Sequence, residues 1–334
     1  MLAGGPLPLW FVGLAWIDLV TMELAGELVS LENGWLRGEV LLLVLGLAPA
    51  LVLGWATRRR RWLRVRALLQ VVLFTGVFGW LVPTVAMARD RLGWADVVAH
   101  PYPVRSLLLT AAVVVAIPAL AAVTELVRAG GTPYPWDPPT RLVTTGPYAY
   151  VANPMQIGIA GLMVVLTLAS GSATLALATV FSLVFSVVLA ERHEELTLRA
   201  RWVAYRDYRR EVRNWLPRWR PWVGEPAMLW TSESCTLCAA TGTMLDTMEP
   251  IGLSRHPAET SPRPLRRMTW EGPDDRSDGV AAFARALEHT TLPWAWLGWW
   301  IRLPVVSAWL QLMADACGLG PRTIASSDDP RVGP

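Results

Sequence analysis

The sequence predicts a mainly α protein, in which a polytopic helical membrane bundle of about five or six spans precedes a small C-terminal α/β domain. The first observation is composition: 53% of the 334 residues are hydrophobic, and they concentrate before Ala190. The second is spacing, because the apolar runs have about the length that a helix needs to cross a bilayer. The third is the change after Pro226, where charged residues, Pro and Gly mix as they do in soluble domains.

Three apolar runs in the first part of the chain predict membrane spans: Val40 to Ala56, Ala67 to Met87 and Ser106 to Val127. An earlier run, Leu7 to Val29, contains three acidic residues. This run either spans the membrane as well, or forms a helix that lies at the membrane interface or faces the helical bundle. In the second case its acidic side chains reach water or pair with Arg. Gly130 and its neighbouring glycine then predict a helix end, since glycine readily adopts the left-handed conformation there.

The orientation of the bundle is predicted by the loop Arg58 to Arg66, which contains six arginines. Basic loops stay in the cytoplasm, so we expect the C-terminus to be cytoplasmic, and the N-terminus too if the first run spans. The N-terminus lacks the features of a cleaved signal peptide. A net charge of +3 is too small to indicate nucleic-acid binding. The expected location is a bacterial-type inner or plasma membrane.

The stretch from Arg128 to Trp222 is predicted to contain the functional site. Its first part is rich in proline, which excludes a continuous helix. Two apolar runs follow, Met155 to Ser170 and Ala173 to Ala190, separated only by Gly171 and Ser172. Such a hairpin returns both polar ends to one membrane face, and the residues that it brings together are Asn153 and Pro154 with Glu194 and Glu195.

The segment Glu191 to Trp222 is basic and aromatic. Its apolar residues recur at steps of three or four, which predicts an amphipathic helix on the membrane surface. The residues of this pattern are Leu198, Trp202, Tyr205 and Tyr208.

These motifs resemble the isoprenylcysteine carboxyl methyltransferase family and its phospholipid- and thiol-methylating relatives. The resemblance rests on a Gly-Pro-Tyr turn, an Asn-Pro element with Gly158, a membrane hairpin, a Glu-Glu pair, spaced tyrosines and an ending with Val212, Trp215 and Pro217. It covers roughly residues 128–222. Two positions differ, because many members have Arg at Ala152 and Tyr at Gln156.

The resemblance implies that S-adenosylmethionine is the cofactor and that the acceptor is a lipophilic molecule entering from the bilayer. The sequence contains no predicted strand followed by a GxGxxG motif, so the mode by which soluble Rossmann-type enzymes bind this cofactor is not indicated. By resemblance, the catalytic residues are Glu195 and Asn153. The implied cofactor-binding residues are Gly146, Pro147, Tyr148, Asn153, Pro154, Glu194, Glu195, Tyr205 and Tyr208.

The C-terminal segment is predicted to fold as strand, turn and helix, with Cys235 and Cys238 as a CxxC pair at the helix start. Together with the later helical run, residues 227–322 resemble the thioredoxin-like DCC thiol-disulfide oxidoreductases, in which a Tyr-Asp-Gly precedes the cysteines. Thr231-Ser232-Glu233 stands there instead. A metal site is not expected, because a second Cys or His pair is missing.

The predicted organisation is therefore a methyltransferase domain over 1–222, a thioredoxin-like cytosolic domain over 227–322 and a disordered tail over 323–334. The predicted function is methylation of an isoprenylcysteine-like carboxylate. Methylation of a phospholipid amine or of a hydrophobic thiol remains an alternative. A membrane-anchored oxidoreductase that uses the two cysteines, with a thiol partner, and a non-catalytic assembly partner are alternatives of other classes.

Overall fold

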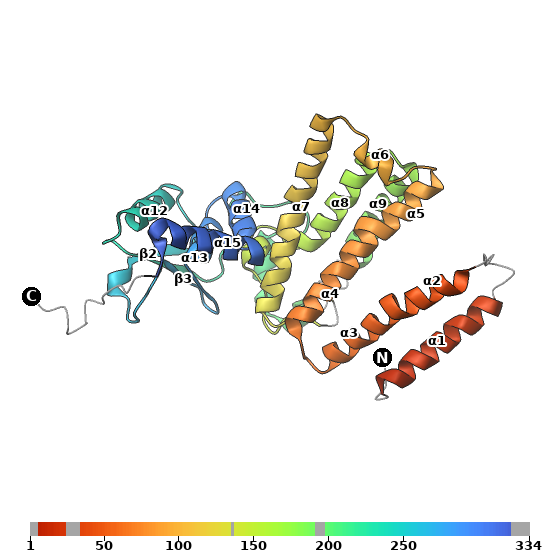
Figure 1. Cartoon of the computed structure of the whole chain (residues 1–334). Helices are drawn as coiled ribbons and strands as arrows, with labels where there is room; N and C mark the ends of the chain where they lie inside the picture. Colours follow the sequence, from red (N-terminus) through yellow and green to blue (C-terminus); the bar gives the residue numbers. More distant parts are fainter. Residues whose placement is uncertain (1–5, 25–33, 135–136, 191–197, 322–334) are drawn as a thin grey trace, which may run out of the picture. The chain divides into compact units, whose positions relative to one another are not determined.

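The computed structural model describes residues 6–24, 34–134, 137–190 and 198–321 (Figure 1). The chain forms two compact units. The first comprises Met1–Leu73 and Gly130–Pro138, and the second comprises Phe74–Ala129 and Pro139–Pro334. The predicted tail 323–334 lies outside the described residues.

The first unit is helical. Its helices are α1 (Leu7–Leu24), α2 (Trp35–Leu42), α3 (Ala48–Arg58) and most of α4 (Leu63–Gly76). A π-helical stretch joins α2 to α3, so that Trp35–Arg58 is one 24-residue helix. This helix contains the predicted span Val40 to Ala56.

Three helices among the described residues are long and apolar enough to cross a membrane: Trp35–Arg58, Leu63–Arg89 and Tyr102–Arg128. Each contains one of the three spans predicted without an alternative. Three shorter apolar helices cover Leu7–Met22, Pro154–Ser170 and Ala173–Val188. The protein is therefore an integral membrane protein by helix length and composition, and the total of five or six spans stays a prediction.

The second unit begins with the end of α4, and its described regular elements up to residue 211 are helices. Its long central helix, α7, runs from Tyr102 to Arg128 and is followed by Gly130 with φ +76°, as the helix-end prediction required. Its helices are α5 (Val82–Arg89), α6 (Trp94–Val98), α7, α8 (Pro154–Ser170), α9 (Ala173–Phe185) and α11 (Tyr205–Glu211).

The predicted hairpin is formed by α8 and α9. Gly171 makes the turn with φ +67°, and Ser172 caps α9 by accepting a hydrogen bond from the Leu175 amide. Asp90 completes the cap, because its carboxylate accepts hydrogen bonds from the Ser172 hydroxyl at 2.6 Å and the Thr174 amide at 2.9 Å. These hydrogen bonds lower the pKa of Asp90 to about 2.

Glycines let α8 pack closely against α7. A Cβ on Gly158 would lie 2.5 Å from the Cβ of Ala119 and 3.0 Å from the Val115 carbonyl. A Cβ on Gly161 would lie 2.9 Å from Val115. Small residues at such crossings are the usual means by which membrane helices approach one another.

The C-terminal part contains a four-stranded sheet of order β2-β1-β3-β4. β1 (Ala227–Thr231) pairs in parallel with β2 (Leu253–Pro257), and α12 (Thr236–Thr247) connects them. β3 (Thr269–Glu271) is antiparallel to both β1 and β4 (Arg276–Asp278). The strand-turn-helix prediction around the cysteines is confirmed.

In the described part of the chain, three α-helices follow the sheet, namely α13 (Val280–Leu287), α14 (Leu292–Ile301) and α15 (Pro304–Ala314). α13 packs on β3 and β4, and its alanines join a core with Leu229, Leu245 and Trp270. α14 packs on α7, and Figure 1 shows the two helices side by side. The sheet region and the central membrane helix therefore belong to one packed unit.

Candidate functional site

The Gly-Pro-Tyr motif forms a buried 3₁₀ turn over Gly146–Ala149. Gly146 has φ +62°, and a Cβ there would lie 2.9 Å from the Cγ of Glu125. Both the backbone conformation and the close contact require glycine. The Gly-Pro-Tyr turn therefore lies directly against the last turns of α7.

The structure brings this turn together with the tyrosines of the basic segment. The Tyr208 hydroxyl donates to the Tyr148 carbonyl at 2.8 Å, and the Ala152 amide donates to the Arg213 carbonyl at 2.9 Å. Tyr205 and Tyr208 are buried in one apolar cluster. The remaining members of that cluster are Ala152, Val212, Leu142, Leu198, Trp202 and Trp222.

The predicted helical pattern of this segment is confirmed only in part. Residues 198–201 and 205–211 are helical, but residues 202–204 interrupt the helix. All four residues of the predicted stripe still pack in the same cluster. The basic segment therefore packs against the loop that contains Leu142 and Ala152 through these four side chains, although its helix is not straight.

Asn153 lies at the N-terminus of α8 and is 8% exposed. Its Nδ2 donates to the Gln156 side chain at a long 3.4 Å. Its Oδ1 has no hydrogen bond to any described residue. Pro154 takes the first helical position, which suits a residue without an amide hydrogen. Glu194 and Glu195 lie outside the described residues, so the meeting of Asn153 with these acids stays a prediction.

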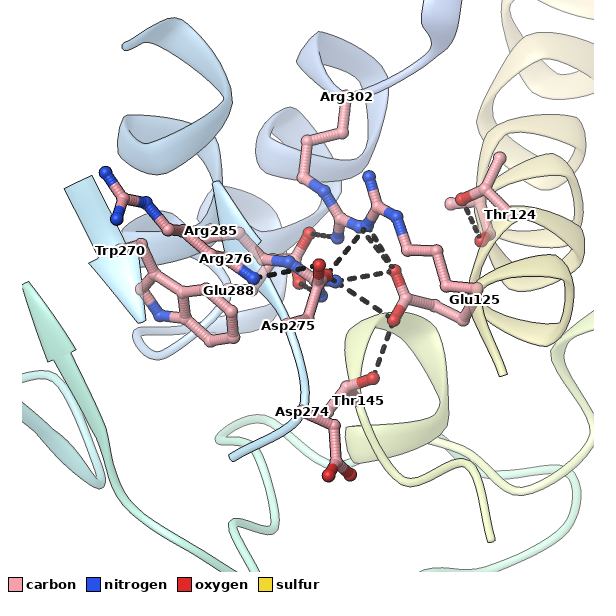
Figure 2. Close-up of polar contacts among 12 residues, drawn as sticks. Thr124, Glu125, Thr145, Trp270, Asp274, Asp275, Arg276, Arg285, Glu288 and Arg302 are labelled. Carbon is pink, nitrogen blue, oxygen red and sulfur yellow. Dashed lines mark hydrogen bonds and ion pairs between the residues drawn. The ribbon is translucent and has the colours of Figure 1, made fainter. Parts of the chain in front are cut away.

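A buried ion cluster joins α7 to the C-terminal helices (Figure 2). Arg285 donates to Glu125 at 3.2 Å, to Glu288 at 3.1 Å and to Asp275 at 2.8 Å. Arg302 bonds to both Glu125 and Glu288. Glu125 and Arg285 are each 2% exposed, so these charges depend on one another for compensation.

Glu125 also reaches the Gly-Pro-Tyr turn. The Thr145 hydroxyl donates to its Oε2 at 2.6 Å, and Arg128 donates to its Oε1 at 3.1 Å. The same carboxylate thus contacts the residue before Gly146 and the arginines of the C-terminal helices. Glu125 is the physical link between the turn and the C-terminal region.

Burial and charge shift the titration of the groups around this cluster. Burial opposes the charged form of Arg285, but Glu125, Glu288 and Asp275 raise its pKa above the ordinary value. Burial raises the pKa of the Glu288 carboxyl to about 8, against the influence of Arg285. Burial also lowers the pKa of His289 to about 4. A water-poor, charge-rich junction therefore lies beside the turn.

A cavity of about 410 Å³ opens between the turn and the C-terminal sheet region. Gly146 and Ala149 line one side, and Trp270 and Arg285 line the other. Its volume lies within the usual range for small-molecule sites. Of the predicted cofactor-binding residues that the structure describes, only Gly146 lines this cavity.

The CxxC pair lies where predicted. Cys235 is the N-cap residue of α12, and both Cys235 and Cys238 are partly exposed. The preceding loop is held by Glu259, which accepts hydrogen bonds from the Ser232 hydroxyl at 2.7 Å and the Glu233 amide at 3.1 Å. Burial opposes the charge of Glu259, yet these hydrogen bonds lower its pKa to about 2. Within the described part of the chain, no cluster of His, Cys, Asp or Glu could hold a metal ion.

Sequence reasoning missed the ion cluster. Glu125 was a usable signal, since an acidic residue in the last turns of an apolar helix needs a partner. Its partners lie 160 and 177 positions further along the chain, and no local pattern marks them.

Comparison with known proteins finds a family for part of this region. No curated protein and no solved structure matches the chain. Residues 104–202, which include most of α7, the Gly-Pro-Tyr turn and the hairpin, match the phospholipid methyltransferase family. The match does not extend to the C-terminal sheet region. It supports an integral membrane methyltransferase that acts on a lipid-like acceptor.

Proposed function

We propose that the protein transfers a methyl group from S-adenosylmethionine to a lipophilic acceptor. One observation carries the proposal: the region that matches the phospholipid methyltransferase family contains the buried Gly-Pro-Tyr turn, and the Tyr208 hydroxyl binds that turn from the basic segment. Two motifs about sixty positions apart thus form one structure beside the apolar hairpin.

The described residues fit a polar donor molecule at this place. Asn153 is buried and still has an oxygen available for a hydrogen bond. The cluster around Tyr205 and Tyr208 offers an apolar, aromatic wall. When bound, S-adenosylmethionine supplies an electrophilic methyl group on a sulfonium. We assign its binding to Gly146, Pro147, Tyr148, Asn153, Pro154, Tyr205 and Tyr208, together with Glu194 and Glu195.

The protein's own contribution is placement and exclusion of water. Methyl transfer requires an in-line approach of the acceptor, and a fixed loop beside an apolar hairpin can provide it. A carboxylate acceptor arrives ionised. An amine or a thiol must lose a proton, and Glu195 is the residue that we assign to accept it.

The acceptor class divides into three candidates. An isoprenylcysteine-like carboxylate is the first, by the motif resemblance. The absence of Arg at Ala152 removes the expected cation for orienting a carboxylate, which favours the second candidate, a phospholipid amine. A hydrophobic thiol is the third. The family match agrees with a lipid-like acceptor and does not separate the three.

The test is transfer of a tritiated methyl group from S-adenosylmethionine to each acceptor class in reconstituted vesicles, followed by organic extraction. Glu195→Ala and Tyr208→Phe should lose donor affinity, measured by calorimetry, while the helical circular dichroism is unchanged. Glu211→Ala, at an exposed residue of the same segment, is the matched control. Unchanged donor affinity in both site variants would remove the proposed site.

The proposed topology can be tested in intact cells and in inverted membrane vesicles prepared from them. The loop Arg58 to Arg66 and the C-terminal part should face the cytoplasm, since basic loops are retained there. Single cysteines at Arg60 and at Arg276 should react with an impermeant maleimide only from the cytoplasmic side. Labelling of Arg60→Cys from outside contradicts the orientation.

A redox function is a second candidate because Cys235 begins a helix directly after a strand, in a sheet where β1 and β2 are parallel. A helix N-terminus stabilises a thiolate. If the thioredoxin-like domain is active, the dithiol should titrate against glutathione buffers as one two-electron couple. A Cys235→Ser, Cys238→Ser double variant that methylates equally with and without reductant would separate this activity from methyl transfer.

A further inference from the structure

The last two helices expose an apolar surface. α14 contains four tryptophans among ten residues and no charged residue. Trp294 is 44% exposed on α14, and α15 exposes Val305 at 82%, Trp309 at 57% and Leu312 at 67%. We call Trp294, Val305, Trp309 and Leu312 the apolar foot. Large exposed apolar surfaces of this kind mark contacts with a partner or a membrane.

The helix α14, which contains Trp294 of the foot, packs on a membrane helix. The Trp296 indole of α14 donates to the Val114 carbonyl of α7 at 3.0 Å. That carbonyl lacks its helical donor, because Pro118 stands four residues later and has no amide hydrogen. Ala295 and Trp299 pack in one cluster with Ile117 and Ala121 of the same helix. α14 therefore binds α7 along a part that is predicted to cross the bilayer.

The depth of this contact follows from the neighbouring helix α8. α8 begins at Pro154, and its Gly158 and Gly161 pack on Val115. At 1.5 Å per residue, these glycines lie about 6 to 10 Å along the helix from its start. Val114, adjacent to Val115, thus lies one to two turns into the apolar hairpin. Trp296 reaches the same level.

We propose that α14 and α15 insert into the membrane interface and that the apolar foot contacts the phospholipids of the leaflet in which α8 begins. Tryptophan prefers this headgroup boundary, and an uncharged helix with exposed tryptophans is suited to it. Two charged residues flank α15 in the sequence, and both are paired: Arg302 is buried with Glu125 and Glu288, and Asp315 binds Arg267. In this arrangement, α14 and α15 anchor the C-terminal part at the membrane surface, and the four-stranded sheet lies in the aqueous phase. This inference does not depend on methyl transfer.

The experiment uses the full chain with its three cysteines replaced by serine, reconstituted in phosphatidylcholine-phosphatidylglycerol nanodiscs. Spin labels are placed at Val305 and Trp309, at Leu109 as a reference on the exposed face of α7, and at Met244 on α12 as the matched aqueous control. Collisions with oxygen and with a water-soluble nickel chelate are measured. Labels at Val305 and Trp309 should favour oxygen over nickel, as at Leu109, while the label at Met244 should favour nickel.

A charge at the foot gives an independent measurement. Trp309→Asp should lower the melting temperature in nanodiscs, while Met244→Asp should leave it nearly unchanged. Nickel access at Val305 and Trp309 equal to that at Met244 overturns the proposal. Exclusion of both probes, with dipolar broadening between labels on two molecules, also overturns it and assigns the surface to a second copy of the chain.

Discussion

At the scale of single residues, Glu125 accepts hydrogen bonds from four side chains, those of Arg128, Thr145, Arg285 and Arg302. Two buried arginines and Thr145 donate to its carboxylate. Replacing Glu125 by a neutral residue therefore removes one buried counter-charge from Arg285 and Arg302, which costs far more than losing an exposed ion pair.

Glu125→Gln should reduce the free energy of unfolding by about 3 kcal/mol, because Arg285 and Arg302 lose one buried counter-charge. Chemical denaturation in detergent micelles measures this change. Asp207→Asn, which breaks an exposed pair with Arg210, is the control and should cost less than about 0.5 kcal/mol. Equal losses for the two variants would contradict a buried cluster.

His289 provides a pH-dependent contribution. Its Nε2 accepts a hydrogen bond from the Trp270 indole at 3.2 Å, and its Nδ1 lies 2.8 Å from the Ile251 carbonyl. The imidazole is therefore neutral, with the proton on Nδ1. Because burial lowers its pKa from 6.5 to about 4, the unfolded chain takes up this proton at a higher pH than the folded one.

Stability from His289 should be fully present above pH 6.5 and should decrease as the pH falls toward 4. The melting temperature of the wild type should fall over this window more steeply than that of His289→Gln. A His256→Gln variant should keep the wild-type slope. Parallel curves for wild type and His289→Gln would show that the histidine is not held neutral.

At the scale of secondary-structure elements, the sequence predicted what depends on local pattern. The three long apolar helices, the Gly171 turn and the strand before Cys235 all follow from neighbours within a few positions. The bend at residues 202–204 does not, and the segment around it packs in a cluster with Ala152, about fifty positions away in the sequence. Periodicity identifies the buried stripe but not whether the helix beneath it is straight.

Pro118 and Trp296 form a coupled pair between two elements. Trp296→Phe should destabilise the protein by about 1 kcal/mol, because the Val114 carbonyl then has no donor. In a Pro118→Ala background the amide of residue 118 satisfies that carbonyl, so the same substitution should cost much less. A double-mutant cycle measures the difference. Additive effects would mean that the indole contributes packing only.

At the scale of the whole molecule, the site could be predicted only where its motifs lie close in sequence or are joined by the hairpin. Asn153 and the Gly-Pro-Tyr turn were predicted, and the turn does meet Tyr208. The ion cluster and the contact of Tyr150 with the C-terminal part could not be predicted. Tyr150 donates to the Glu288 carbonyl, 138 positions away, and no composition or spacing signals such a pair.

These long-range contacts predict the folding behaviour of the second unit. The methyltransferase-like helices and the C-terminal sheet share the cluster of Glu125 with Arg285 and Arg302, and an apolar core with Tyr150 and Trp299. We expect them to unfold in one transition, although the sequence suggests separate domains on either side of residues 222–227. Thiol exposure at the CxxC pair and loss of helical circular dichroism should have the same midpoint in urea.

Arg302→Met breaks the cluster and should move the two midpoints apart, whereas Arg276→Met, at an exposed residue of the same sheet region, should leave them coincident. Separate midpoints in the wild type would contradict the shared core and restore two independent domains.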